Sequence, residues 1–328
     1  MRSWAVEGFL LLALSSAVAA ERLPGYHADV STFTVSGVSS GGYMAVQVHF
    51  AHSSRVSGVG ALAAGPYYCA RGSLWRAWNE CMKGSPPVSK KESELLARDA
   101  RIDPIANIAR ARVWLFSGTH DRTVVPAVVD ALAGQYTLFG PAPVVVKDKP
   151  AGHAMVTEDA GNACSVSEPP FINDCDYDAA GALLRHLLDG LSTPSKAPGG
   201  RLVRFEQGEF GGTRAVSMAA DGFFYLPKAC EAERCRVHVV FHGCRQGADQ
   251  IGERFVRDAG YNRWADTNRL IVLYPQALGR YVWWTFNPRG CWDWWGYTGQ
   301  DYATKEAAQI RAVMAMVERL GSKPKERG

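Results

Sequence analysis

The chain has 328 residues, of which 47% are apolar and 21% are charged, and its formal net charge is +4. This length can bury a sizeable core, and the ordinary composition excludes an intrinsically disordered chain. The positive charge is too weak and too scattered to indicate nucleic acid, so no nucleic-acid partner is expected.

The first twenty residues are typical of a signal peptide. Arg2 supplies a positive charge, residues 9–14 form a short apolar segment, and residues 17–19 fit a small-x-small cleavage site. The apolar segment is too short to span a bilayer and no second long one follows, so no membrane span is expected. A buried first helix is the alternative. We therefore expect a secreted protein, extracellular or periplasmic, whose mature chain is residues 21–328.

Eight cysteines in an exported chain indicate disulfides. Short loops close most easily, so sequence neighbours are the expected partners: Cys69–Cys81, Cys164–Cys175, Cys230–Cys235 and Cys244–Cys291. A zinc site is the alternative, but it favours closely spaced ligands and the sequence has no Cys-x-x-Cys. No metal and no cofactor are expected.

A candidate nucleophile lies near the start of the mature chain. Residues 31–35 alternate like a strand, and residues 42–50 have helical character. Between them, Gly37-Val-Ser39-Ser-Gly41 matches the pattern G-x-S-x-G. A strand, a sharp glycine turn and a helix form the setting of a nucleophile elbow, which predicts Ser39 as a nucleophile that needs a nearby base. The alternative is a glycine-rich surface turn.

Two later strands are each followed by a candidate partner for Ser39. Residues 113–116 predict a strand before Asp121, and residues 144–146 predict one before His153. The carboxyl ends of parallel strands meet at one edge of a sheet, where the elbow also lies. The order Ser, Asp, His is that of α/β-hydrolases, in which the histidine takes the serine proton and the aspartate fixes its tautomer. A solvated loop acid is the alternative for Asp121.

The second half of the chain repeats the strand and helix signals. A connection rich in Pro, Gly and Ser at residues 192–200 follows a leucine-rich helical face at residues 183–191. Beyond it, residues 237–241 and 270–274 predict strands, and residues 310–320 predict a final helix. Alternating strands and helices predict an α/β fold with a mostly parallel sheet and helices on both faces. We expect a single domain, with 192–200 as a soft internal connection.

The second half also contains a candidate oxyanion loop. Acyl transfer uses two backbone N–H donors, one from the residue after the nucleophile, here Ser40, and one usually from a loop upstream of the serine. Only a short strand precedes Ser39, but His242-Gly-Cys244 follows the strand at 237–241. We therefore predict the N–H of Cys244 as the second donor and a circularly permuted hydrolase. The alternative is a turn that is merely held by a disulfide.

Aromatic residues cluster near residues 281–297. Five tryptophans fall within thirteen residues, together with Tyr281, Phe286 and Tyr297: Trp283, Trp284, Trp292, Trp294 and Trp295. Binding sites favour apolar and aromatic walls, so Trp292, Trp294 and Trp295, together with Tyr43, are the predicted substrate contacts. About half of the clustered rings are expected to belong to the core, because large rings dominate burial.

Four segments resemble the poly(3-hydroxybutyrate) depolymerases that have a permuted α/β-hydrolase catalytic domain. The segments span nearly the whole mature chain: residues 37–44, 162–178, 241–247 and 287–297. The resemblance implies an esterase acting on esters of 3-hydroxybutyrate, with a triad at Ser39, Asp121 and His153 and oxyanion donors at Ser40 and Cys244. Many members of this family carry a further polymer-binding module, which we do not expect here. Soluble or amorphous polymer, or short oligomers, would then be the better substrate.

The sequence therefore predicts a secreted serine esterase that acts on a polyester or oligoester through an acyl-enzyme on Ser39. A feruloyl or acetylxylan esterase could share the same triad and export signal and is the first alternative. The second is a non-catalytic polymer-binding protein that uses the aromatic cluster. No oligomeric state is predicted.

Overall fold

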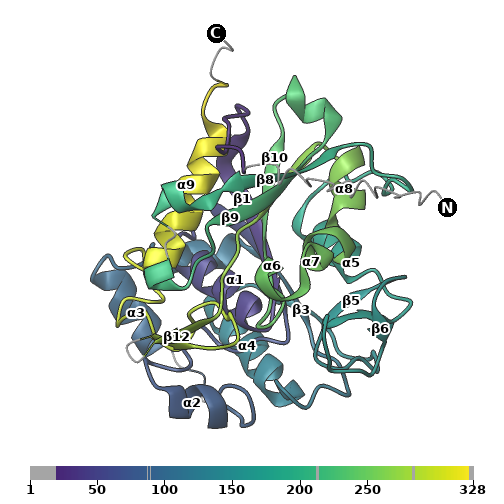
Figure 1. Ribbon diagram of the computed structural model, residues 1–328. Coiled ribbons are helices and arrows are strands. Elements are labelled where there is room, and N and C mark those ends of the chain that lie inside the picture. Colours follow the sequence, from purple (N-terminus) through teal and green to yellow (C-terminus); the bar gives the residue numbers. More distant parts are fainter. Residues whose placement is uncertain (1–19, 87, 89, 212–213, 283–284, 325–328) are drawn as a thin grey trace, which may run out of the picture.

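The structure is a computed structural model that describes residues 20–86, 88, 90–211, 214–282 and 285–324 (Figure 1). Residues 1–19 of the expected signal peptide lie outside these ranges, as do Trp283 and Trp284. No helix in the described ranges is long and apolar enough to cross a bilayer.

Eight strands of the described chain form one sheet in the order β4-β3-β2-β1-β10-β11-β9-β8. The strands from β4 to β11 in this order pair in parallel, and β9 and β8 complete the sheet in antiparallel pairing. Their bounds are β1 Asp29–Val38, β2 Val56–Leu62, β3 Arg112–Phe116, β4 Val144–Val146, β8 Arg201–Glu206, β9 Asp221–Leu226, β10 Arg236–Phe241 and β11 Leu270–Tyr274. Smaller strands pair elsewhere: β5 Met155–Thr157, β6 Asn162–Ala163 and β7 Ile172–Asp174 in one sheet, and β12 Arg280–Val282 with β13 Thr285–Asn287 in another.

The centre of the sheet joins strands from the two halves of the chain. β1 lies between β2 and β10, with Ser36 opposite Val240 and Gly37 opposite Phe241. The strand that leads to Ser39 therefore neighbours the strand that leads to His242, as the permuted order predicts. Since the segments before and after residues 192–200 contribute strands to the same sheet, that connection lies within one α/β unit.

Helices cover both faces of the sheet (Figure 1). Buried residues of α1, α4 and α9 share one core with one face of the strands, and those of α5, α7 and α8 share a second core on the other face. The helix bounds are α1 Ser40–Ala51, α2 Leu74–Asn79, α3 Lys91–Arg98, α4 Pro126–Phe139, α5 Ala179–Leu187, α6 Ala248–Ile251, α7 Arg254–Asp258, α8 Tyr261–Thr267 and α9 Ala308–Gly321. Short 3-10 turns occur at η1 Ile105–Arg110, η2 Gln207–Phe210, η3 Arg214–Val216 and η4 Lys228–Glu231.

One expected helix is shorter than its leucine pattern suggests. The pattern extends to Leu191, but α5 ends at Leu187 and Leu188 is already extended, with φ −126° and ψ 139°. Gly190 adopts a positive φ of 68°, a conformation that ends helices. The leucines beyond Leu187 still pack against the second core, so apolar spacing alone could not place this end.

Four disulfides join the pairs that the sequence analysis expects. The Cα–Cα distances are 6.0 Å for Cys69–Cys81, 4.6 Å for Cys164–Cys175, 5.6 Å for Cys230–Cys235 and 4.2 Å for Cys244–Cys291. The last pair closes the longest loop, with a sequence separation of 47, and ties the residues after β10 to those after β13.

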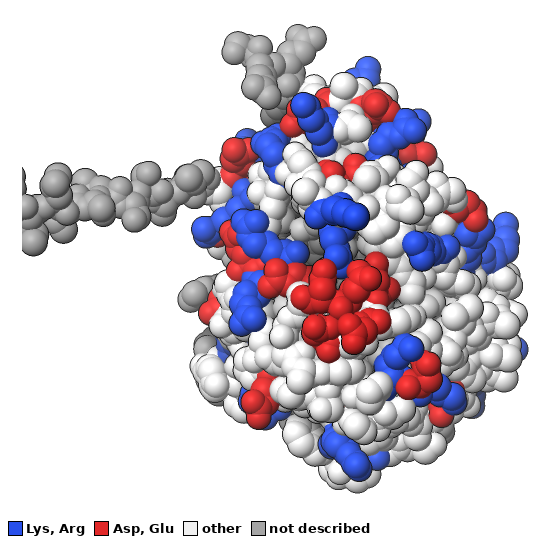
Figure 2. All heavy atoms as spheres, turned by 90° about the vertical axis from the view of Figure 1, so that its right-hand side faces the viewer, with Lys and Arg blue, Asp and Glu red and all other residues white. Residues whose placement is uncertain are grey.

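Charges of both signs share the face of the molecule shown in Figure 2. Acidic side chains gather near the middle of this view, with basic side chains around them. This face therefore presents a mixed charge pattern instead of a continuous basic surface.

Candidate active site

Ser39 lies on a sharp turn between β1 and α1. Its backbone has φ 57° and ψ −125°, a conformation that L-residues rarely adopt. Neighbouring glycines allow this turn to pack against the end of β10, since a Cβ on Gly41 would lie 2.2 Å from the carbonyl oxygen of Phe241 and one on Gly37 would lie 2.8 Å from it. The turn therefore has the strained geometry of a nucleophile elbow.

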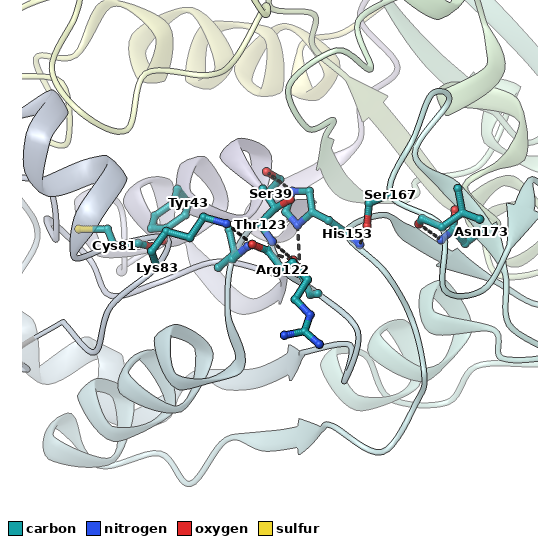
Figure 3. Close-up of polar contacts among 12 residues, drawn as sticks. Ser39, Tyr43, Cys81, Lys83, Arg122, Thr123, His153, Ser167 and Asn173 are labelled. Atoms are coloured by element: carbon teal, nitrogen blue, oxygen red, sulfur yellow. Dashed lines mark hydrogen bonds and ion pairs between the residues drawn. The ribbon is translucent and has the colours of Figure 1, made fainter.

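The three residues predicted as a triad lie together, and Figure 3 shows the side chains of Ser39 and His153 pointing toward one another. The distance from His153 Nε2 to Ser39 Oγ is 2.8 Å, and that from His153 Nδ1 to Asp121 Oδ2 is 2.7 Å. Asp121 is buried, and its Oδ1 accepts hydrogen bonds from the backbone N–H groups of Thr123 and Val124 at 2.7 and 2.9 Å. The carboxylate can thus hold a proton on Nδ1, which leaves Nε2 free to accept the Ser39 proton.

The loop that carries His153 is held by the loop closed by the Cys164–Cys175 disulfide. The backbone N–H of His153 donates to Ser167 Oγ at 2.8 Å, and that of Gly152 donates to the Cys164 carbonyl at 2.8 Å. Asn173 Nδ2 in turn donates to the carbonyls of Cys164 and Val166. Sequence reasoning did not single out Ser167 or Asn173, although both lie in the segment 162–178 that carries part of the resemblance.

The candidate oxyanion loop follows β10 directly. A Cβ on Gly243 would lie 3.3 Å from the Ser39 Cβ, so the backbone of this loop lies against the nucleophile. Cys244 lines the same cavity as Ser39 and His153. Ser40 is the first residue of α1, and the first N–H groups of a helix have no partner within it. Both predicted donors are therefore placed beside Ser39.

His242 determines the orientation of the peptide between Gly243 and Cys244. The N–H of Ala277 donates to His242 Nε2 at 3.0 Å, so Nε2 is the acceptor and Nδ1 carries the ring proton. Nδ1 lies 2.7 Å from the Gly243 carbonyl oxygen and donates to it. In a trans peptide the N–H points opposite to the C=O, so the Cys244 N–H is directed away from His242. Burial lowers the pKa of His242, which keeps its ring neutral.

A second side chain fixes the other end of this loop. Gln246 Oε1 accepts the N–H of Gly243 at 2.6 Å, and its Nε2 donates to the Phe171 carbonyl at 2.7 Å. Gln246 therefore connects the oxyanion loop to the loop that supports His153. Neither His242 nor Gln246 was assigned a positioning role from the sequence, because their partners are backbone groups that only the fold brings near.

A cavity of about 160 Å³ opens in front of Ser39. Its lining is mixed, with polar, cationic and apolar residues: Val38, Ser39, Thr123, His153, Ala154, Ser167, Phe171, Cys244, Arg245, Gln246 and Arg289. The nucleophile, the base and one candidate oxyanion donor thus share one solvent-facing space, which is the arrangement that acyl transfer requires.

Comparison with known proteins agrees with this geometry. A family described as esterase PHB depolymerase matches residues 221–323. The poly(3-hydroxybutyrate) depolymerase of Delftia acidovorans is 44% identical over 95% of this chain, which spans 64% of that relative's length. The polyhydroxybutyrate depolymerase of Talaromyces funiculosus is 36% identical over 95% of this chain and 96% of its own length. The chain belongs to the PHB depolymerase family.

Two solved structures of PHB depolymerases have the same fold. The enzyme from Penicillium funiculosum superposes with a TM-score of 0.85, at 33% identity, and the match covers 92% of this chain and all of that one. A serine-to-alanine variant of a PHB depolymerase complexed with R3HB trimer superposes with a TM-score of 0.87, also at 33% identity and with the same coverage.

Three of the aromatic residues that were predicted as substrate contacts are buried in the structure. Trp292 is fully buried, Trp294 is 6% exposed and Tyr43 is 3% exposed, and none of them lines the cavity at Ser39. Tyr43 stacks on Trp294 with ring centroids 4.2 Å apart, and its hydroxyl donates to the Cys81 carbonyl. These rings belong to the hydrophobic core and lie outside the cavity lining, and their role as substrate contacts stays a prediction.

A buried carboxylate explains why this segment turns inward. Asp293 accepts backbone N–H groups from Gly296, Tyr297 and Thr298 at 2.7 to 3.0 Å, which folds the chain into a tight turn. An extended wall would have left alternate rings facing the cavity, whereas the turn packs them against the sheet. Trp295 stays half-buried and lies outside the cavity lining, and its role as a substrate contact remains a prediction.

Proposed function

We propose that this chain is a secreted serine esterase that hydrolyses poly(3-hydroxybutyrate) or oligomers of 3-hydroxybutyrate through an acyl-enzyme on Ser39. The observation that carries the proposal is the hydrogen-bonded line from Asp121 through His153 to Ser39 at the wall of one cavity. The names of the relatives, and the R3HB trimer bound by one structural neighbour, support the choice of polyester.

In the acylation step, Ser39 Oγ attacks the carbonyl carbon of an ester while its proton moves to His153 Nε2. The negative charge that develops on the carbonyl oxygen is stabilised by the backbone N–H groups of Ser40 and Cys244. Collapse of this intermediate breaks the bond to the leaving oxygen, which takes the proton from His153. The alcohol fragment departs and the acyl group stays on Ser39.

In the deacylation step, water attacks the acyl carbon and gives a proton to His153. A second oxyanion forms in the same place and collapses, which releases a carboxylic acid and returns the proton to Ser39 Oγ. Asp121 stabilises the imidazolium that exists in both steps.

The proposed export of the protein rests on its disulfides and on its N-terminal sequence, and not on the active-site geometry. Four disulfides among the eight cysteines favour an oxidising compartment, and the first twenty residues have the pattern of a signal peptide. Detection of the protein outside the producing cytoplasm, with a mature N-terminus near residue 21, would test this part directly.

The proposed activity is tested with 3-hydroxybutyrate oligomers, amorphous polymer and a feruloyl sugar ester as substrates. We expect hydrolysis of the first two only, and a loss of kcat of about three decades in Ser39→Ala. Ser31→Ala is the matched control, because Ser31 is exposed on the same strand and is not among the residues that line the cavity. Near-normal turnover by Ser39→Ala, or turnover of the feruloyl ester alone, would contradict the proposal.

A further inference from the structure

Two arginines stand at one side of the cavity that contains Ser39. Arg245 and Arg289 both line it, and both are exposed to solvent. The backbone N–H of Arg245 donates to the Arg289 carbonyl at 2.7 Å. Arg245 also follows Cys244 directly, and Arg289 lies two residues before Cys291, so the Cys244–Cys291 disulfide ties the two segments together. The two cationic residues are therefore held at the same part of the cavity.

Neither arginine is neutralised within the described ranges of the chain. Other arginines of the protein form ion pairs, such as Arg112 with Asp189 and Arg257 with Glu253. For Arg245 and Arg289 the described residues provide no acidic partner, and no Asp or Glu lines the cavity. Asp121 lies behind His153 and is already bonded to that ring and to two backbone N–H groups. The cavity thus carries two uncompensated positive charges.

Positive charge at this place is not needed for the interior of a polyester, because repeating ester units are neutral. The end of a short oligomer is different, since its terminal carboxyl is ionised near neutral pH. Guanidinium groups bind carboxylates through paired, charge-assisted hydrogen bonds. A substrate with a carboxylate close to the scissile ester would therefore find its partner in this cavity.

The direction of the ester fixes which fragment carries that carboxylate. In an oligomer of 3-hydroxybutyrate, the acyl group that reaches Ser39 belongs to the hydroxyl end, and the leaving alcohol belongs to the carboxyl end. We propose that Arg245 and Arg289 form a subsite that binds the terminal carboxylate of the leaving fragment, so that short oligomer acids are preferred and are shortened from their carboxyl end. This inference rests on the proposed esterase function and specifies its substrate.

The test compares R3HB trimer as the free acid with its methyl ester, at low salt. We expect the wild-type enzyme to prefer the acid in kcat/KM. Arg245→Gln and Arg289→Gln should each lower kcat/KM for the acid by about tenfold and leave the value for the methyl ester within about twofold, because a charge-assisted hydrogen bond is lost only with the acid. The preference should also weaken as salt is raised.

Arg311→Gln is the matched control, because it removes the same charge from a residue that is exposed on α9 and absent from the cavity lining. This variant should leave kcat/KM unchanged for both the acid and the methyl ester. Equal rates for acid and methyl ester in the wild type, or equal losses on both substrates in the variants, would overturn the proposal. The proposal would also be overturned if Arg245→Gln and Arg289→Gln changed only the inhibition by added 3-hydroxybutyrate, because the arginines would then bind the released acid and not the substrate. Failure of the wild type to hydrolyse either trimer would instead contradict the esterase function itself.

Discussion

At the scale of single residues, the side chain of His242 links the segment after β11 to the candidate oxyanion loop. It has no hydrogen bond to Ser39, Asp121 or His153, yet its Nδ1–H donates to the carbonyl of the peptide whose N–H is the proposed second oxyanion donor. The Ala277 N–H holds the other ring nitrogen, so the ring can neither rotate nor exchange its tautomer without losing a bond. We regard His242 as a positioning residue that keeps the Cys244 N–H directed away from β10 and available to substrate.

Replacing His242 should therefore affect the transition state more than substrate binding. We expect His242→Ala to lower kcat by about a hundredfold with little change in KM, which is the effect of losing one oxyanion donor. His242→Asn retains a donor near the position of Nδ1 and should recover part of this loss. Steady-state kinetics of both variants on a 3-hydroxybutyrate oligomer is the measurement. A change confined to KM, or no recovery in the asparagine variant, would show that His242 only fills space.

At the scale of elements, the elbow depends on the close approach of α1 to the end of β10. A Cβ on Gly41 would lie 2.2 and 2.4 Å from the carbonyl oxygens of Phe241 and His242, and both are backbone atoms that cannot turn aside. Gly41→Ala should therefore separate the two elements, with a loss of about 1 to 3 kcal/mol of stability and most of the activity. Thermal unfolding and esterase rate are measured together.

Gly134→Ala in α4 is the control for this variant. A Cβ at Gly134 would meet only Val88, at 3.9 Å, so it has room. Alanine in a helix interior should raise the stability by about 0.5 to 1 kcal/mol and leave the activity unchanged. If Gly41→Ala behaved like Gly134→Ala, the packing of the elbow on β10 would not matter for the site.

The disulfides make a second prediction at this scale. Cys244–Cys291 closes a loop of 47 residues at the cavity, whereas Cys230–Cys235 closes one of 5 residues away from it. Chain entropy predicts losses of about 4 and about 2 kcal/mol when these bridges are removed. We expect Cys291→Ser to lower both the thermal midpoint and kcat, and Cys230→Ser to lower only the midpoint. An unchanged kcat in Cys291→Ser would show that the Cys244–Cys291 disulfide does not affect catalysis.

The elements and their order could be predicted well from the sequence because the signals were local. The G-x-S-x-G turn, the acid and the base each lie within a few residues of the short strand that precedes them. The aromatic cluster could not be placed in this way. Its rings turn inward because Asp293 accepts hydrogen bonds from the backbone N–H groups of the residues that follow it. No spacing in the sequence indicates such a turn. The positions of Arg245 and Arg289 at the cavity could not be predicted for a similar reason. The two residues are far apart in sequence and are brought together by the Cys244–Cys291 disulfide and by the packing of the sheet.

At the scale of the whole molecule, buried histidines predict how stability depends on pH. Burial lowers the pKa of His49 and of His238 to about 3. A histidine in the unfolded chain takes up a proton near pH 6.5, so below this pH the unfolded state binds more protons than the folded state. The free energy of unfolding should therefore fall as the pH falls towards 3, by about 1.4 kcal/mol per pH unit for each such histidine, and be fully retained above pH 7.

Thermal or denaturant unfolding between pH 7 and pH 4 measures this dependence. His49 Nδ1 lies 2.9 Å from the Tyr136 hydroxyl, a contact that His49→Gln can largely replace. This variant should show a slope that is shallower by about 1.4 kcal/mol per pH unit, because one proton fewer is taken up on unfolding. An unchanged slope would mean that His49 is protonated in the folded protein.

The permuted order of the sheet was also predictable, but by elimination. No loop upstream of Ser39 could supply a second oxyanion donor, and a loop of the right kind followed a strand in the second half. The pairing of β1 with β10 brings this loop to Ser39. Distant segments thus complete one site, and the resemblance to a permuted family made this arrangement easier to expect than local patterns alone would have done.

The central claim is that Ser39 carries the acyl group during hydrolysis of 3-hydroxybutyrate esters. The most direct measurement is mass spectrometry of peptides from an acid-quenched reaction with a 3-hydroxybutyrate oligomer under turnover conditions. We predict a 3-hydroxybutyryl adduct on the peptide that contains Ser39, present in the wild type and absent in Ser39→Ala. An adduct on another residue, or oligomer hydrolysis that continues in Ser39→Ala, would contradict the account.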